Sequence, residues 1–296
     1  MSFLGELSAL SSAGLWAGTS LIFASVTAKI SPVQVNINRM AFAVCLFFFS
    51  IFTLHIPIQL SRTQVVNLVL SGIVGLVFGD TFLFKAFQQI GARISMLIMS
   101  LAPAISAVLA YIFLQEFLSL WAIVGMIVTL GGIALVVLER TAPVTARYPI
   151  TKIGLWCAFL GALGQGGGVV LAKKAFMEGP IHGLVAALIR ISAALLILIP
   201  AALATGRDPS PIKFFAHNRR ILLLLVVGSV FGTYFGITLS LVAVAYTKVG
   251  IASTLMATSP VMMLPLVRIV HKEILSWKAI VGACFAVGGV AMLFLT

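Results

Sequence analysis

The chain of 296 residues is 61% hydrophobic and only 9% charged, with a formal net charge of +12. Because charged residues make up about a quarter of an ordinary soluble domain, this composition excludes a soluble globular protein. Apolar runs of roughly 20 residues recur from end to end, and each is long enough to cross the ~30 Å hydrocarbon core as a helix. The sequence therefore predicts a polytopic membrane protein. Its surplus of basic residues belongs in loops on one side of the bilayer and indicates no nucleic-acid partner.

Polar residues, Gly and Pro divide the apolar sequence into ten expected transmembrane helices. In chain order these cover residues 4–28, 33–54, 64–86, 92–114, 118–138, 150–172, 180–203, 219–244, 249–270 and 275–295. The first run has no basic segment before it, so we expect a retained helix and not a cleaved signal peptide. Residues 140–149 are the natural linker between two five-helix halves, 4–139 and 150–296.

Residues 71–139 are repeated 157 residues later without a gap. The matched positions include Gly75 with Gly232, Gly79 with Gly236, Pro103 with Pro260, Glu116 with Glu273, and Gly131 and Gly132 with Gly288 and Gly289. The first two spans match at other offsets, through the Gly-Leu-Trp sequences ending at Trp16 and Trp156 and through Arg39 and Arg190. Since each half has an odd number of spans, the second half enters the membrane from the opposite side. Such inverted repeats are typical of secondary transporters with a site between the repeats.

Several of these motifs resemble the drug/metabolite transporter superfamily, in its EamA-type branch with ten helices. They are the Gly-Leu-Trp first helix, Arg39 in the second helix, the Gly-Asp-x-x-x-Phe-x-Ala third helix from Gly79 to Ala86, Ala102 and Pro103 in the fourth, and Glu116 before a Gly-Gly fifth helix. The resemblance covers essentially the whole chain. It implies two inverted five-helix repeats around a central cavity and the export or exchange of small metabolites. Amino acids are the best-known bacterial substrates.

The charge distribution and the resemblance differ on which side the termini face. Loops on the side opposite the termini hold most of the basic residues, so the positive-inside rule places both termini outside. The resemblance implies termini in the cytoplasm. In either orientation we expect a multi-pass protein of the cytoplasmic (inner) membrane of a bacterium, functional as a monomer. Its expected partners are the lipid bilayer and a small-molecule metabolite, with a coupling proton as a further candidate.

Three charged residues inside the expected spans are candidates for substrate binding or coupling: Asp80, Arg39 and Arg190. A lone carboxylate in an apolar span is costly and is a functional candidate by default. Asp80 would titrate with a coupling proton or hold a substrate ammonium. The alternative is a structural ion pair with Lys85, Arg39 or Arg93. The two arginines would bind a substrate carboxylate, or else hold helix carbonyls or snorkel to the interface. Together the three charges suit a zwitterion or a small anion.

Polar and aromatic residues complete the expected cavity wall: Trp16, Trp156, Tyr234, Gln165, Ser100 and Ser259. For each aromatic residue, ordinary packing is the alternative. The glycine-rich residues 164–168 are expected to interrupt the sixth span and to expose backbone groups to the cavity. Pro103 and Pro260 lie in the middle of the expected fourth and ninth spans, where a proline bends a helix, so both are candidate hinges.

Glu116 and Glu273 stand just before the fifth and tenth spans, where a carboxylate favours the start of a helix. We expect both to cap helix ends, with a role in gating as the alternative. No motif indicates covalent or metal chemistry. Cys45, Cys157 and Cys284 lie inside apolar runs without a Cys-x-x-Cys or a Cys/His cluster, which argues against disulfides and a zinc site. We therefore expect no metal and no cofactor.

A secondary transporter of small organic metabolites, working by alternating access, is the function that the sequence favours. The absence of a P-loop gives no support to direct ATP drive. An intramembrane aspartyl protease would need a second membrane aspartate beside Asp80, so we expect no enzyme. A lipid-moving or sensing protein, or a channel, on the same fold is the alternative. A strongly selective channel would need a ring of carbonyls or charges, and only residues 164–168 hint at one.

Overall fold

The computed structural model describes residues 3–27, 29–139, 151–204, 206, 218–263 and 276–295, and every regular element within these ranges is a helix. The first half holds α1 (Leu4–Thr27), α2 (Pro32–Thr53), α3 (Arg62–Gly72), the π-helical η1 (Ile73–Gly79), α4 (Asp80–Met99), α5 (Ala102–Leu114) and α6 (Leu120–Glu139). The second half holds α7 (Lys152–Met177), α8 (Gly183–Ala204), α10 (Arg219–Gly228), the π-helical η2 (Ser229–Phe235), α11 (Gly236–Tyr246), α12 (Val249–Met256) and α14 (Trp277–Phe294). The expected all-helical fold is confirmed for these residues.

Eight helical stretches of the described chain are long and apolar enough to cross a membrane. They are α1, α2, the stretch from α3 through residue 90, α6, α7, α8, the stretch from α10 through α11, and α14. Two shorter apolar helices, Ala102–Leu114 and Val249–Met263, lie where the fourth and ninth spans are expected. A multi-pass membrane protein is supported, and the count of ten spans stays a prediction.

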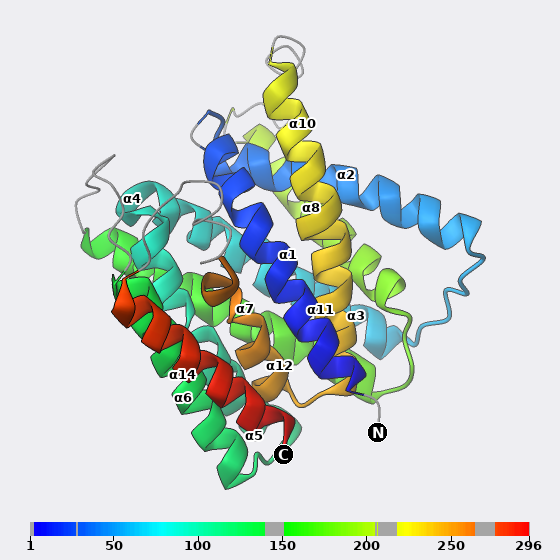
Figure 1. Cartoon of the computed structure of the whole chain (residues 1–296). Helices are drawn as coiled ribbons and strands as arrows, with labels where there is room; N and C mark the ends of the chain where they lie inside the picture. Colours follow the sequence, from blue (N-terminus) through cyan, green and yellow to red (C-terminus); the bar gives the residue numbers. More distant parts are fainter. Residues whose placement is uncertain are drawn as a thin grey trace.

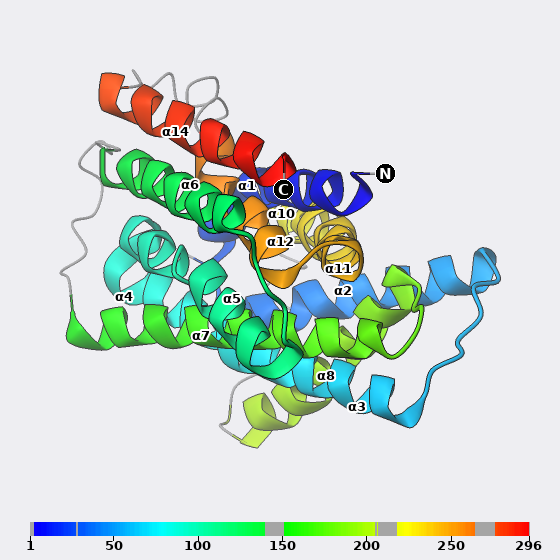
Figure 2. The same cartoon turned by 90° about the horizontal axis from the view of Figure 1, so that it is seen from below.

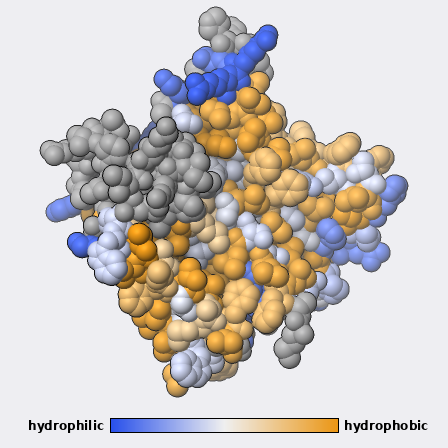
Figure 3. Space-filling model, in the orientation of Figure 1, coloured by the Kyte–Doolittle hydropathy of each residue, from blue (hydrophilic) through white to orange (hydrophobic). Residues whose placement is uncertain are grey.

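The outer surface fits a lipid environment. Apolar side chains cover much of the face seen in Figure 3, and hydrophilic residues gather at its margins, at the start of α10 and beside the end of α2. On α2 the neighbouring side chains of Phe48, Phe49 and Phe52 are all exposed, a pattern that a bilayer would cover. The start of α1 and the end of α14 lie side by side at one end of the molecule in two perpendicular views (Figure 1, Figure 2). This placement agrees with an even number of membrane crossings.

Equivalent helices of the two halves pack against each other. Helix α6 contacts its equivalent α14, and α2 contacts its equivalent α8. Helix α1 packs against η2 and α11, just as α7 packs against η1 and α4. These contacts either join two equivalent helices or have a counterpart elsewhere. A two-fold relation between the halves produces this arrangement.

The α6–α14 contact shows the direction of that relation. A Cβ added at Gly125 would lie 3.1 Å from the carbonyl oxygen of Gly289, and one added at Gly132 would lie 2.5 Å from that of Gly282. The later residue of α6, Gly132, faces the earlier residue of α14, Gly282. The two helices are therefore antiparallel. Since Gly125 is equivalent to Gly282 and Gly132 to Gly289, the two equivalent helices run in opposite directions. This geometry supports the expected inverted topology.

The expected boundary between the third and fourth spans is wrong. The backbone stays helical through residues 88–93, and the chain turns instead at Ser100 and Leu101. In a continuous helix the ring of Pro103 would clash with the carbonyl four residues earlier, and α4 ends at that residue, Met99. The polar residues at 88–93 do not end the helix, because nothing in their backbone prevents helical hydrogen bonds.

The matched prolines are therefore not in the middle of continuous helices. Pro103 occupies the first turn of α5. In the second half α12 ends at Met256, four residues before Pro260, and the helix resumes at Ser259 after a turn. A proline suits the first turn of a helix, where its missing N–H would have no partner. The two halves thus share a break at the same place, although a hinge role for the prolines stays a prediction.

The glycine-rich residues 164–168 do not interrupt their helix, since α7 is continuous from Lys152 to Met177. Instead, the glycines allow close packing. A Cβ at Gly164 would lie 2.6 Å from the Cα of Gly79, and one at Gly168 would lie 2.7 Å from the Cα of Gly75. Small residues therefore bring the backbones of α7 and η1 together, as in other closely packed membrane helices.

Candidate functional site

A cavity of about 270 Å³ lies between the two halves. The first half contributes Trp16, Thr19, Ser20, Phe23, Arg39, Leu76, Asp80, Leu83, Phe84, Phe87, Met96, Met99, Ser100, Ala102 and Pro103, and the second half contributes Gln165, Gly166, Val169, Arg190, Gly232, Ile237, Ser240, Ser253, Met256, Ala257, Ser259 and Pro260. Most of this lining is apolar. The volume of the cavity is just below the range of about 300–1,000 Å³ typical of drug-sized ligand sites, so the cavity suits a small ligand.

A buried ion pair lies at the cavity wall. Asp80, the first residue after η1, accepts a hydrogen bond from Nη2 of Arg39, and the two residues are only 7% and 8% exposed. Arg39 also donates from Nε and Nη2 to Oδ1 of Asn36, at 2.9 and 2.8 Å. Asn36 in turn donates to the carbonyl of Leu76 at 3.2 Å, which ties α2 to η1. Of the alternatives that the sequence leaves open for Asp80, the ion pair with Arg39 is present.

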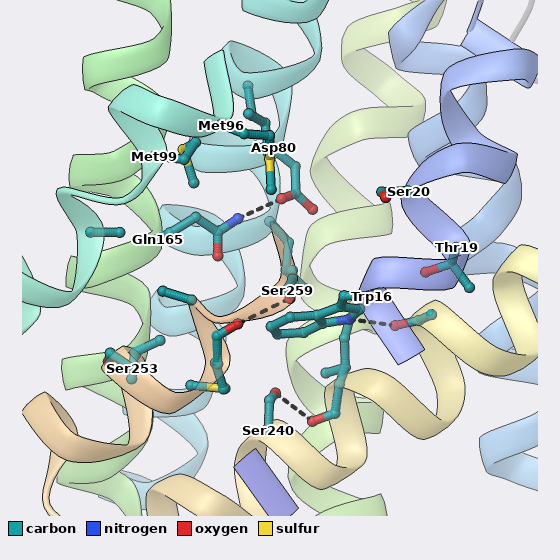
Figure 4. Close-up of a pocket in the computed structure, with 18 of the residues that line it drawn as sticks. Trp16, Thr19, Ser20, Asp80, Met96, Met99, Gln165, Ser240, Ser253 and Ser259 are labelled. Atoms are coloured by element: carbon teal, nitrogen blue, oxygen red, sulfur yellow. Dashed lines mark hydrogen bonds between the residues drawn. The ribbon is translucent and has the colours of Figure 1, made fainter. Parts of the chain in front are cut away.

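The second half supplies two further groups to this cluster. Gln165 of α7 donates from Nε2 to Oδ1 of Asp80, and Figure 4 shows its amide pointing across the cavity at the carboxylate. Arg190 of α8 also lines the cavity and is only 4% exposed. Its Nε has no hydrogen-bond partner in the described part of the chain. The structure therefore brings four of the expected site residues together, and both halves contribute to the cluster.

The π-helical segments offer backbone acceptors to the helices that pack on them. Trp16 donates from Nε1 to the carbonyl of Gly232 in η2 at 2.9 Å (Figure 4), and Gln165 donates to the carbonyl of Gly75 in η1 at 3.3 Å. Gly75 and Gly232 are equivalent positions of the two halves. Trp16 and Gln165 therefore occupy equivalent places, 149 residues apart. π-turns of this kind are frequent at functional sites.

The expected equivalence of Trp16 and Trp156 is wrong. Trp156 is 65% exposed on the outer surface of α7 and does not line the cavity. The Gly-Leu-Trp sequences match at an offset of 140 residues, whereas the packing against the matched glycines sets the offset at 149. The shared three residues are thus a poorer guide to position than the helix contacts.

Tyr234 also lies outside the cavity. Its hydroxyl is 2.7 Å from Oγ of Ser50, and its ring packs against Phe47 with centroids 4.8 Å apart. Both partners belong to α2, so Tyr234 joins η2 to that helix. Ser100 and Ser259 do line the cavity, as do the two prolines beside the helix breaks.

Helical periodicity could have found several further lining residues. On α1, Thr19, Ser20 and Phe23 follow Trp16 by three, four and seven positions, and on α4 Phe84 and Phe87 follow Asp80 by four and seven. Residues at these spacings share one helix face. Figure 4 shows Thr19 and Ser20 on the α1 side of the cavity. The sequence carried this signal, but it did not tell which helices face one another.

A polar network joins the two halves at the end of the molecule that carries the termini. Glu116, between α5 and α6, accepts a hydrogen bond from the N–H of Val249 at 2.8 Å, and Lys173 of α7 lies 3.7 Å from the same carboxylate. Lys173 also donates to the carbonyls of Val244 and Thr247. We call this network the termini-side latch. Glu116 thus caps a helix of the other half, and not α6, whose start is capped by Ser119. Glu273 lies outside the described residues.

Comparisons with known proteins agree with this architecture. The model of the EamA-like transporter family matches residues 3–138 and again residues 152–295. The chain belongs to the EamA-like transporter family. It is therefore a multi-pass membrane protein of a family of transporters of small molecules.

One solved structure, titled "Crystal structure of protein", is similar over 98% of this chain and 97% of its own, with a TM-score of 0.77 and 18% sequence identity. At that identity the likeness supports the fold alone. The comparison with curated proteins gives no match.

Proposed function

We propose that this EamA-like protein is a secondary carrier that exports or exchanges small organic metabolites by alternating access between its two inverted halves. The observation that carries the proposal is the cavity between the halves, where Arg39, Asp80, Gln165 and Arg190 meet. Polar groups that converge in an apolar cavity are typical of a ligand site, and inverted-repeat transporters place that site between the repeats. Amino acids are the first substrate class to test, and the expected location is the cytoplasmic membrane of a bacterium.

The termini-side latch supports alternating access. Glu116 and Lys173 join the first helix of the second half to the loop between α5 and α6, and the N–H of Val249 brings in α12. Near them, Ser106 of α5 donates to Oγ of Ser253 of α12 at 2.9 Å. Contacts between the halves at one end, with a cavity beyond them, fit one state of a carrier whose halves rock around a fixed site.

Counterflow in proteoliposomes tests the proposal. Vesicles loaded with an unlabelled solute would be diluted into the labelled solute, using a panel of amino acids, organic acids, sugars and amines. We expect saturable uptake of one class that depends on the same solute inside. Flux without saturation would indicate a channel instead. No flux for any solute would move the assignment to a lipid-moving or sensing role.

The variant Asp80→Asn tests whether the measured counterflow depends on the cavity. Breaking a buried ion pair leaves an uncompensated charge and typically costs about 3–5 kcal/mol, so we expect counterflow to fall by at least about tenfold. Glu178→Gln is the matched control, because Glu178 is an exposed acid at the end of α7. Retained exchange with loss of pH-driven accumulation would assign proton coupling to Asp80. Unchanged behaviour in both assays would return Asp80 to a purely structural role.

A further inference from the structure

The cavity carries a surplus of positive charge. Among the described residues that line it, only Arg39, Arg190 and Asp80 carry a charge. Arginine stays protonated in proteins. Whether Asp80 is ionised or protonated, at least one positive charge is therefore left without a compensating negative one. A buried charge in a membrane protein is costly unless it is paired, so this surplus calls for a counter-ion.

Arg39 is not the free cation. Its Nε and Nη2 donate to Asn36, and Nη2 also donates to Asp80. Its guanidinium lies over the rings of Phe23 and Phe84, with Cζ 5.7 and 5.4 Å from their centroids. Aromatic faces attract a cation in this position. The side chain is thus fixed by five contacts to four residues, and its charge is paired with Asp80.

Arg190 makes no ion pair within the described residues, and the charge of Asp80 acts on it only from a distance. The two ion pairs within the described residues are Arg39 with Asp80 and Lys173 with Glu116, and neither includes Arg190. Asp80 is already engaged on both oxygens, one by Arg39 and the other by Gln165. The Nε of Arg190 is buried and has no hydrogen-bond partner among the described residues. A buried guanidinium that lines a cavity, with its Nε unpartnered, offers a positive charge and a hydrogen-bond donor to an anion.

The rest of the wall selects for an apolar body. Trp16, Phe84, Phe87, Met96 and Met256 line the same cavity. Methionine and aromatic side chains provide an adaptable apolar surface. The lining holds no acid besides Asp80 within the described residues, so it offers no free carboxylate to a substrate ammonium.

We propose that the cavity binds a small amphipathic organic monoanion, a carboxylate with an apolar body, and that Arg190 binds its carboxylate. This inference rests on the proposed function, because it names the substrate class of the same site. A monoanion neutralises the surplus charge. A zwitterion does not, and its ammonium would enter a cavity that is already cationic. Amino acids are therefore weaker ligands of this site than carboxylic acids of the same shape.

A charge series on one carbon skeleton tests this inference by binding. The ligands would be 3-phenylpropionate, 3-phenylpropanamide, L-phenylalanine and phenethylamine, with hexanoate, hexanamide, L-norleucine and hexylamine as a second series with an aliphatic body. Each would be added to the purified full-length protein in detergent, and the shift of the thermal unfolding midpoint would be measured, since a ligand stabilises the state that it binds. We expect the carboxylate to bind at least about tenfold more tightly than its amide in one series or both.

Variants at Arg190 locate the effect. Arg190→Gln is expected to remove the preference for the carboxylate, and Arg190→Lys is expected to keep part of it because the charge remains. Lys174→Gln, which removes an exposed cation of α7, is the matched control and is expected to keep the full preference. If Arg190→Gln does not fold, Arg190→Lys and the wild-type charge series still decide the matter.

The outcomes separate the inference from the proposed function. Equal or tighter binding of the amide or the amino acid in both series, no binding of either carboxylate, or an unchanged preference in Arg190→Gln would each overturn the inference. Saturable counterflow of a neutral or zwitterionic solute alongside such a result would leave the carrier function standing. Absence of saturable counterflow for every solute would overturn the carrier function itself.

Discussion

At the scale of single residues, Trp16 and Trp156 form a natural test of the site. Both end a Gly-Leu-Trp sequence, but Trp16 lines the cavity and donates to Gly232, whereas Trp156 is exposed. Trp16→Ala removes a large side chain and leaves a backbone carbonyl without its partner, so we expect a loss of about 3–5 kcal/mol of stability and little remaining counterflow. Trp156→Ala is expected to change stability by no more than about 0.5 kcal/mol.

Thermal unfolding in detergent and counterflow in vesicles check this pair. If Trp156→Ala impaired transport as much as Trp16→Ala, the assignment of the cavity wall would be wrong. The helix register that pairs Trp16 with Gln165 would then have to be reconsidered as well.

The charged residues of the site could be predicted from the sequence, because any charge in an apolar span is conspicuous. Their partners could not. Asp80 had three possible basic partners, and only the packing of α2 against α4, which begins at Asp80, selects Arg39. That Nε of Arg190 has no hydrogen-bond partner among the described residues likewise depends on how the helices assemble. A sequence shows the charge of a residue but not its neighbours.

At the scale of helices, the neighbouring glycines Gly131 and Gly132 of α6 differ in their surroundings, because only Gly132 lies against α14. A Cβ at Gly132 would lie 2.4 Å from the backbone nitrogen of Ala286, whereas one at Gly131 would meet nothing within 4 Å. Gly132→Ala forces the helices apart and is expected to cost roughly 1–3 kcal/mol. Gly131→Ala is expected to be neutral or to stabilise by up to about 1 kcal/mol through helix propensity. Midpoints of thermal unfolding measure both, and an equal loss in both variants would contradict this packing.

The expected helix boundaries failed where side-chain polarity and backbone geometry disagree. The break expected at residues 88–93 rests on polar residues, but a polar side chain leaves the backbone free to continue a helix. Pro103 and Pro260, expected inside helices, instead mark where the preceding helix must stop. The π-helical segments have no pattern in a single sequence that would predict them, although their matched glycines indicate close packing.

At the scale of the whole molecule, the repeat could be predicted well, because a gapless offset of 157 residues is visible directly in the sequence. The same offset predicts which residues should meet in the opposite state of the carrier. Ser106 and Ser253 meet near the termini-side latch. Their equivalents in the opposite halves are Met263 and Met96, and Met96 lines the cavity. If the halves exchange conformations, the two methionines should meet when the two serines separate.

Cysteine cross-linking distinguishes these two states. In a background with Cys45, Cys157 and Cys284 replaced by Ser, one variant would carry Ser106→Cys with Ser253→Cys, and another Met96→Cys with Met263→Cys. The serine oxygens lie 2.9 Å apart, so the two side chains are in direct contact, as a disulfide between cysteines at these positions requires. We expect the first pair to cross-link under mild oxidant in resting vesicles. The second pair should cross-link more during counterflow, when the opposite state is visited.

Each cross-link should also abolish counterflow, and reduction should restore it, because a carrier needs both states whereas a channel or a static binding protein does not. A cross-linked serine-site pair that still exchanged substrate would contradict alternating access. A methionine-site pair that never cross-linked during turnover would show that the halves do not exchange conformations. In that case the two-fold relation would describe the ancestry of the protein and not its transport cycle.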